Sequence, residues 1–191
     1  SKTNVVFSNG GTGIGSFGGF NIGDHLRFGQ STNETDVGTS RFILTNTFND
    51  TSNWESLDFR VIRGNNANGG ERPDSGEDLV LYFRSPDTAG NTFFRVGTIL
   101  DNNSSNGQNS PIWKRLNLPS LARAQGVQFA IRSTGTYYAS PEGFDHYGLQ
   151  QVNVNIGVSG FTDYEYVNEL ATEAEDWGSI YYGNESNVPF G

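Results

Sequence analysis

A regular succession of short apolar runs, separated by clusters of Gly, Asn, Asp and Ser, constrains the fold of this chain more than any other feature. The runs are rich in Phe, Val, Ile and Leu, and their length is typical of strands. We expect strands at residues 25–29, 41–48, 56–64, 78–84, 92–100, 112–118, 127–133 and 147–158. Eight such strands in a chain of 191 residues predict an all-β fold, a jelly-roll β-sandwich of two antiparallel sheets.

Alternation within these runs predicts which side chains form the core. In the third run Leu57, Phe59 and Val61 share one face, while Asp58 and Arg60 lie on the other. The same period of two predicts core faces in the seventh and eighth runs, formed by Val127, Phe129 and Ile131, and by Val152, Val154 and Ile156. Trp54 and Trp113 are also expected to anchor the core rather than to contact a ligand.

Two flanks depart from this pattern and divide the chain into a Gly-rich N-terminal arm at 1–23, a sandwich at 24–160 and an acidic tail at 161–191. The arm contains "GIGSFG", which satisfies a dinucleotide-binding glycine pattern, but no helical period follows it, so we expect a loop or a close-packed edge. Apolar residues at helical spacing in the tail predict a short amphipathic helix before Gly178, with Val167, Leu170, Ala171, Ala174 and Trp177 on one face.

Composition disfavours several classes of partner and chemistry. The formal net charge of −9 disfavours binding to nucleic acid or to anionic membranes, because both depend on Lys and Arg. The absence of cysteine excludes a disulfide framework, zinc–thiolate sites and thiol catalysis. No apolar run reaches the length of about 18 residues that a membrane span requires, so no membrane insertion is expected, and "SKTNVVF" lacks the apolar core of a signal peptide.

The stretch "NGGERPDSGEDL" places four carboxylates, those of Glu71, Asp74, Glu77 and Asp78, directly before a strand. Two interpretations remain open on the residues alone. The stretch is either a hairpin loop whose acids face water, or a site for a hard cation, since clustered carboxylates and turn carbonyls are the ligands that calcium prefers.

The order of several short motifs around this stretch resembles a known family. The succession "LDFRVIRGNNANGGERPDSGEDLVLYFRSPDTAGNTFFRVGTIL", "WKRLNLPSLARAQGVQFAIRS" and "FDHYGLQQVNV" is similar to jelly-roll modules related to reelin repeats and MAM domains, over roughly residues 56–156. Those modules commonly carry a structural calcium ion. The resemblance implies that calcium would be bound at one edge of the sandwich by Glu71, Asp74, Glu77, Asp78 and Asp145.

This sequence also departs from the family pattern. His146-Tyr147 stands where the pattern has Asn-Trp, and Gln150-Gln151 replaces its second acidic pair, so any ligands from that pair are missing. In the tail, "TEAEDWGSI" is similar to short repeats of very long structural proteins of marine phages, particularly cyanophages. That similarity implies a module of a larger virion or surface-fibre protein.

Few residues suggest catalysis. His25 follows Asp24 and His146 follows Asp145, but adjacent residues of a strand point to opposite faces and cannot orient one another. A pair of glycosidase carboxylates can arise in any acid-rich sandwich and stays open, although the acids here cluster in turns. We therefore predict that the protein is not an enzyme.

The resulting prediction is a non-enzymatic structural or adhesion module of an extracellular or virion-surface assembly, such as a fibre or appendage subunit. Self-association would use apolar residues of the two flanks, namely Val5, Val6, Phe7, Leu170, Trp177 and Ile180. The alternative is a carbohydrate-binding module in which exposed aromatic rings stack on sugars, with Tyr137, Tyr138 and Tyr147 as candidates, unless these rings cover the edges of the core.

Overall fold

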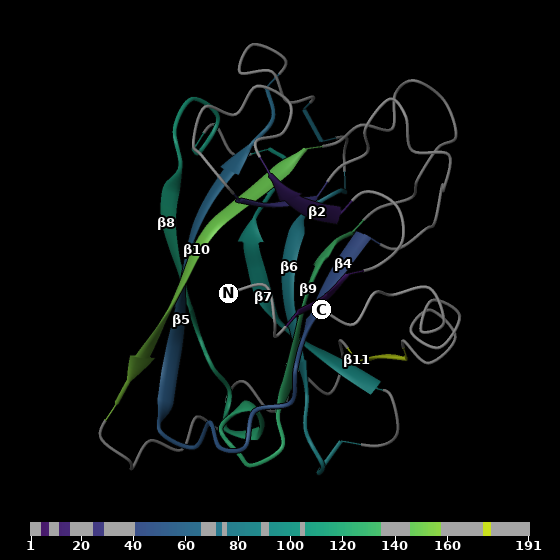
Figure 1. Cartoon of the computed structure of the whole chain (residues 1–191), viewed down its shortest axis with the longest axis vertical. Coiled ribbons are helices and arrows are strands. Elements are labelled where there is room, and N and C mark those ends of the chain that lie inside the picture. The colour runs from purple at the N-terminus through teal and green to yellow at the C-terminus, as the bar shows by residue number, and fades with distance from the viewer. Residues whose placement is uncertain are drawn as a thin grey trace.

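The computed structural model describes residues 5–7, 12–15, 25–28, 41–65, 72–73, 76–88, 92–103, 106–134, 146–157 and 174–176. Apart from one turn of 3-10 helix, the regular elements of these residues are strands (Figure 1). In chain order they are β1 (Val5–Phe7), β2 (Thr12–Gly15), β3 (His25–Phe28), β4 (Arg41–Thr45), β5 (Trp54–Arg63), β6 (Leu79–Arg84), β7 (Thr92–Leu100), β8 (Ile112–Asn117), η2 (Ser120–Ala122), β9 (Gln128–Ser133), β10 (Tyr147–Ile156) and β11 (Ala174–Asp176).

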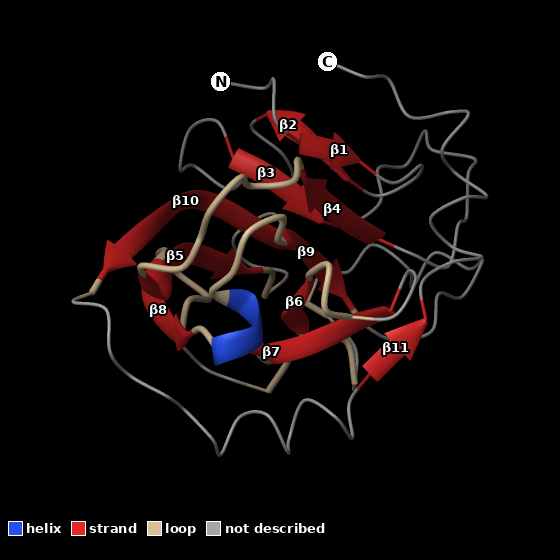
Figure 2. Ribbon diagram, turned by 90° about the horizontal axis from the view of Figure 1, so that it is seen from below, coloured by secondary structure: helices blue, strands red, loops and turns tan. Residues whose placement is uncertain are grey.

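The strands form two antiparallel sheets. Sheet A has the order β1-β4-β9-β6-β7-β11 and sheet B the order β2-β3-β10-β5-β8. Without the short strands β1, β2 and β11, each sheet keeps four strands, and the orders β4-β9-β6-β7 and β3-β10-β5-β8 are those of a jelly roll. Viewed along the sandwich, β8, β5 and β10 lie together on one side and β7, β6 and β9 on the other (Figure 2). All eight strands expected from the sequence are present, and the predicted fold class is confirmed.

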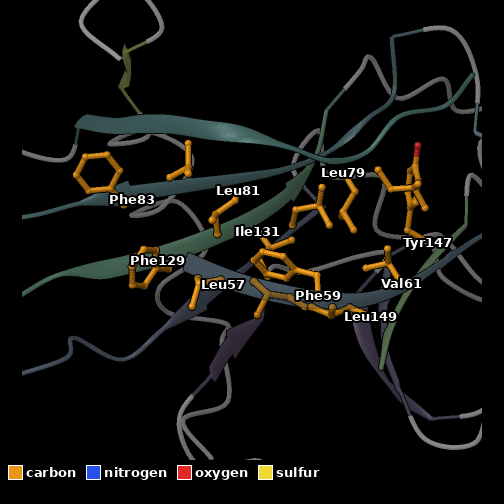
Figure 3. Packing of buried hydrophobic residues seen from close by; sticks show 14 of the residues in the cluster. Leu57, Phe59, Val61, Leu79, Leu81, Phe83, Phe129, Ile131, Tyr147 and Leu149 are labelled. Carbon is orange, nitrogen blue, oxygen red and sulfur yellow. The ribbon is translucent and has the colours of Figure 1, made fainter. Parts of the chain in front are cut away.

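The core lies between the two sheets, as alternation predicts for β5 and β9. Leu57, Phe59 and Val61 of β5 face Phe129 and other apolar residues of sheet A (Figure 3). Trp54 stacks on Phe129 with ring centroids 6.0 Å apart, so it anchors the core as expected. Burial of such side chains supplies most of the stabilisation of a sandwich, at about 1.5–3 kcal/mol for each large residue.

Two predictions about the core are wrong. Trp113 is 49% exposed, and Val152, Val154 and Ile156 of β10 are 43%, 39% and 67% exposed. The two valines lie opposite the buried residues Leu57 and Phe59, so they share the core-facing side of sheet B without being covered. Alternation identifies the face of a side chain, but burial also requires a second layer over that face.

The flanks also differ from expectation. Ala174–Asp176, which belong to the predicted helix, form β11 and pair with β7, because the edge of a sheet offers free backbone groups that override a local helical pattern. The rest of the predicted helix lies outside the described residues. Val5–Phe7 pairs with β4 of its own chain, and the expected part of these residues in self-association stays a prediction.

Candidate functional site

One end of the sandwich gathers polar side chains from segments that are far apart in sequence. The hydroxyl of Tyr147, at the start of β10, donates a 2.6 Å hydrogen bond to the backbone carbonyl of Glu77, just before β6. The Oδ1 atom of Asp78 accepts a hydrogen bond from the backbone N–H of Asn102. The acidic stretch and the "FDHYG" segment therefore meet at this end, as the family resemblance implies.

Burial at this end is deep. Arg63 and Tyr147 have no exposed surface, and Glu77 is almost completely buried. Desolvation, followed by the negative charge of Asp78, raises the pKa of the Tyr147 hydroxyl above its usual value, so this group stays protonated. Burial lowers the pKa of the Arg63 guanidinium, and the charge of Asp101 partly offsets that effect. Arg63 thus provides a buried positive charge beside the acids of the polar end.

A calcium site is not assembled by the described residues alone. Among them no group of three or more His, Cys, Asp or Glu side chains is placed to hold a metal ion. Glu77 and Asp78 belong to the implied ligand set and lie at the polar end, but Glu71, Asp74 and Asp145 lie outside the described residues. Oxygen donors of this kind fit the chemistry of calcium, and calcium binding stays a prediction.

The aromatic residues expected to hold a sugar fall into two groups. Tyr147 is buried and its hydroxyl is engaged, so no face of its ring is available for stacking. Tyr137 and Tyr138 lie outside the described residues, as do the predicted assembly residues Leu170, Trp177 and Ile180.

The outer face of sheet B carries a second group of polar residues around an exposed indole. Trp113 of β8 lies opposite Arg60 of β5, and Arg60 lies opposite Gln151 of β10. The next row along the strands contains Arg115, Asp58 and Asn153 in the same register. Because directly opposite residues of antiparallel strands share a face, these six side chains form one surface, which we call the Trp113 face.

The charges of the Trp113 face are arranged unevenly. The guanidinium of Arg115 donates two hydrogen bonds to the Asp58 carboxylate, of 2.7 and 2.8 Å, and this pair lowers the pKa of Asp58 to about 2. Arg60 forms no ion pair with any residue in the described part of the chain. Among the described residues, the face therefore presents a neutralised pair beside one guanidinium that has no ion-pair partner.

Sequence reasoning missed Trp113, although the signal was present. In "IWKRLN" Ile112, Lys114 and Leu116 lie opposite the core-facing residues of β5, while Trp113 alternates with Arg115 and Asn117. Because Arg115 and Asn117 are polar, the residues that alternate with Lys114 and Leu116 are expected to point outward, Trp113 among them. Tryptophan is usually a core residue, and this expectation outweighed the pattern.

Comparisons with known proteins identify no family for this chain. No family model matches the chain, and no curated protein matches it. A cleaved adhesin domain of Lys-gingipain from Porphyromonas gingivalis matches with a TM-score of 0.48 and 18% identity, over 78% of this chain and 85% of that one. A carbohydrate-binding module specific for non-crystalline cellulose matches with a TM-score of 0.46 and 12% identity, over 83% of this chain and 90% of that one. At these TM-scores and identities the two matches carry no information about the residues of a site.

Proposed function

We propose that the chain is a non-enzymatic binding module that holds a glycan on the Trp113 face. The observation that carries this proposal is a tryptophan that is 49% exposed, placed in register beside Arg60 and Gln151 on the outer face of sheet B. Neighbouring strands lie about 4.8 Å apart, so three strands offer a platform on which an extended ligand can lie across several side chains. A sugar ring stacked on the indole would be hydrogen-bonded by the polar residues around it.

The available guanidinium favours sugars that carry a carboxylate or sulfate. Arg60 has five N–H donors in a planar arrangement that matches such an anion, whereas Arg115 already donates to Asp58. We therefore expect acidic glycans to bind more tightly than neutral ones of the same size. Gln151 and Asn153, which are hydrogen-bonded to each other over 2.8 Å, supply further polar atoms for hydroxyl groups.

Binding without catalysis fits the electrostatics of this face. A general acid must hold a proton at working pH, but the carboxylate at the centre of the face is kept ionised by Arg115, with its pKa lowered to about 2. Asp58 thus orients an arginine and supplies no proton to a leaving group.

A glycan array and titration calorimetry test the proposal. We expect Trp113→Ala to weaken binding at least tenfold and Trp113→Phe to weaken it less, because the smaller ring still offers a stacking surface. Since half of the indole is in solvent, both variants should remain folded. Tyr137→Ala with Tyr138→Ala is the matched comparison, because it removes the aromatic pair that the sequence suggested. If the Tyr137→Ala, Tyr138→Ala double variant loses binding while Trp113→Ala keeps it, the glycan binds at the two tyrosines and not on the Trp113 face.

The setting that this function suggests is an extracellular or virion surface, where a glycan-binding module serves adhesion. Within the described part of the chain no helix has the length and apolar character needed to cross a membrane. Attachment of the module to a larger fibre or appendage, and calcium binding at the polar end, belong to the same proposal.

A further inference from the structure

Among the strands that the structure describes, none pairs with the second half of β10 on the side away from β5. β3 pairs with β10 only at Tyr147–Leu149, and beyond that point β10 has β5 on one side and no described strand on the other. Hydrogen bonds of Gln151–Ile156 to other parts of the chain are confined, within the described residues, to the β5 side. The arrowhead of β10 accordingly lies at the margin of the molecule, away from β2 and β3 (Figure 2). Within the part of the chain that the structure describes, a row of backbone N–H and C=O groups is therefore open to another strand.

The side chains of this edge favour pairing instead of preventing it. Natural edge strands are usually blocked by charge, proline or a covering element. Residues 147–157, "YGLQQVNVNIG", contain no Asp, Glu, Lys, Arg or Pro. Val152, Val154 and Ile156 are exposed on one face and alternate with Gln151, Asn153 and Asn155 on the other. The side chains of an added strand would pack beside the three apolar residues and extend the core-facing side of sheet B.

We propose that this edge pairs antiparallel with the same edge of a second copy of the chain, with the two Val154 residues directly opposite each other. In this register Val152 lies opposite Ile156 of the other copy, and Asn153 lies opposite Asn155. All three apolar residues then meet apolar partners, and amides meet amides. β3 limits the free window at one end, so the paired segment spans Gln151 to Gly157.

A second copy is the partner that charge and pattern both favour. Each chain carries a formal net charge of −9, so two copies repel wherever acids face each other. The uncharged β10 edge is a place where two acidic chains can approach without opposing carboxylates. In an antiparallel pair centred on one residue, each core-facing residue lies opposite another core-facing residue. A strand that alternates apolar and polar side chains is therefore complementary to itself.

Sedimentation velocity over a wide concentration range tests the association. We expect a reversible dimer that becomes more populated as salt screens the net charge. Val154→Lys should yield a monomer, because a lysine on each copy would place two like charges in contact. Gln125→Lys is the matched control, since it makes the same charge change at an exposed turn and should leave the dimer intact. A wild-type monomer at every concentration, or a dimer unaffected by Val154→Lys, overturns the proposal.

Cysteine cross-linking tests the register, because the native chain has no cysteine. Opposite residues of an antiparallel pair have Cα atoms about 4.5–5.5 Å apart, within the range of a disulfide. Val154→Cys should therefore cross-link to itself under mild oxidation. Val152→Cys should not, since two copies of residue 152 would lie about 13 Å apart, but a mixture of Val152→Cys and Ile156→Cys should form a mixed dimer. Equal self-linking of the Val152→Cys and Val154→Cys variants would exclude this register.

Discussion

The two halves of β10 have the same alternating pattern and opposite environments. Tyr147–Leu149 is buried between β3 and β5 and beneath sheet A, whereas four of the next residues along the strand, from Gln151 to Val154, are exposed. The first half supplies the core and the polar end, and the second half supplies the free edge and part of the Trp113 face. One strand thus stabilises the core at one end and carries exposed side chains at the other.

Truncation of one apolar side chain in each half measures this difference most directly. Leu149 is almost completely buried, so Leu149→Ala should lower the free energy of unfolding by about 2–5 kcal/mol. Val154→Ala should cost about 1 kcal/mol or less, because the valine is partly in solvent. Urea denaturation at a protein concentration below that of association compares the two. Equal losses would show that the second half of β10 is covered in solution.

Calcium is expected to act on the first half alone. Ions that bind only the native state stabilise it by about 2.7 kcal/mol at a hundredfold excess over the dissociation constant. We predict that EDTA lowers the melting temperature and that calcium restores it.

A variant locates the calcium effect. Glu77→Gln should reduce the calcium-dependent shift, while Asp50→Asn, which alters an exposed acid outside the polar end, should leave it unchanged. If neither EDTA nor calcium changes the melting temperature, calcium does not bind at the polar end, and Arg63 is the buried cation there.

Removal of the Tyr147 hydroxyl measures how much one buried hydrogen bond in the first half of β10 contributes to stability. Tyr147→Phe deletes the 2.6 Å hydrogen bond to the Glu77 carbonyl and should destabilise the protein by about 1 kcal/mol. The pKa of Tyr147 is raised in the folded state, so its contribution is complete below the unfolded value of about 10 and declines as the pH rises above it. The stability difference between wild type and variant should therefore shrink from pH 9 to pH 11. A constant difference would mean that Tyr147 ionises equally in both states.

The smallest expected effect on stability concerns Asp58, which lies beside the exposed half of β10. Asp58 lies opposite Asn153, and its pair with Arg115 lowers its pKa to about 2. Its stabilising contribution is present above the unfolded pKa of about 4 and is lost as the pH falls towards 2. Asp58→Asn should thus be slightly less stable than wild type at pH 5, and thermal unfolding should show the two converging near pH 2. If the two proteins are equally stable at pH 5, the Asp58–Arg115 pair does not contribute to stability.

Much of the fold, and little of the site, could be predicted from the sequence. The strand at 92–100 was predicted at its observed bounds, and Leu57, Phe59 and Val61 face the core, because period-two alternation is a local property of the chain. Trp113 was expected in the core and is half exposed, whereas Tyr147, left open between a sugar-stacking ring and a ring at the core edge, is buried. Whether a ring is covered depends on the opposite sheet, which the local pattern does not contain.

The sequence by itself determined the strands, their inward and outward faces, and the all-β class, since these follow from residue type and spacing. Only the tertiary structure decided that β3 accompanies β10 for three residues, and that Trp113, Arg60 and Gln151 come together in one row. Strand order and register are set by the packing of two complete sheets. The exposed side chains of the second half of β10 and the composition of the Trp113 face are consequences of that packing.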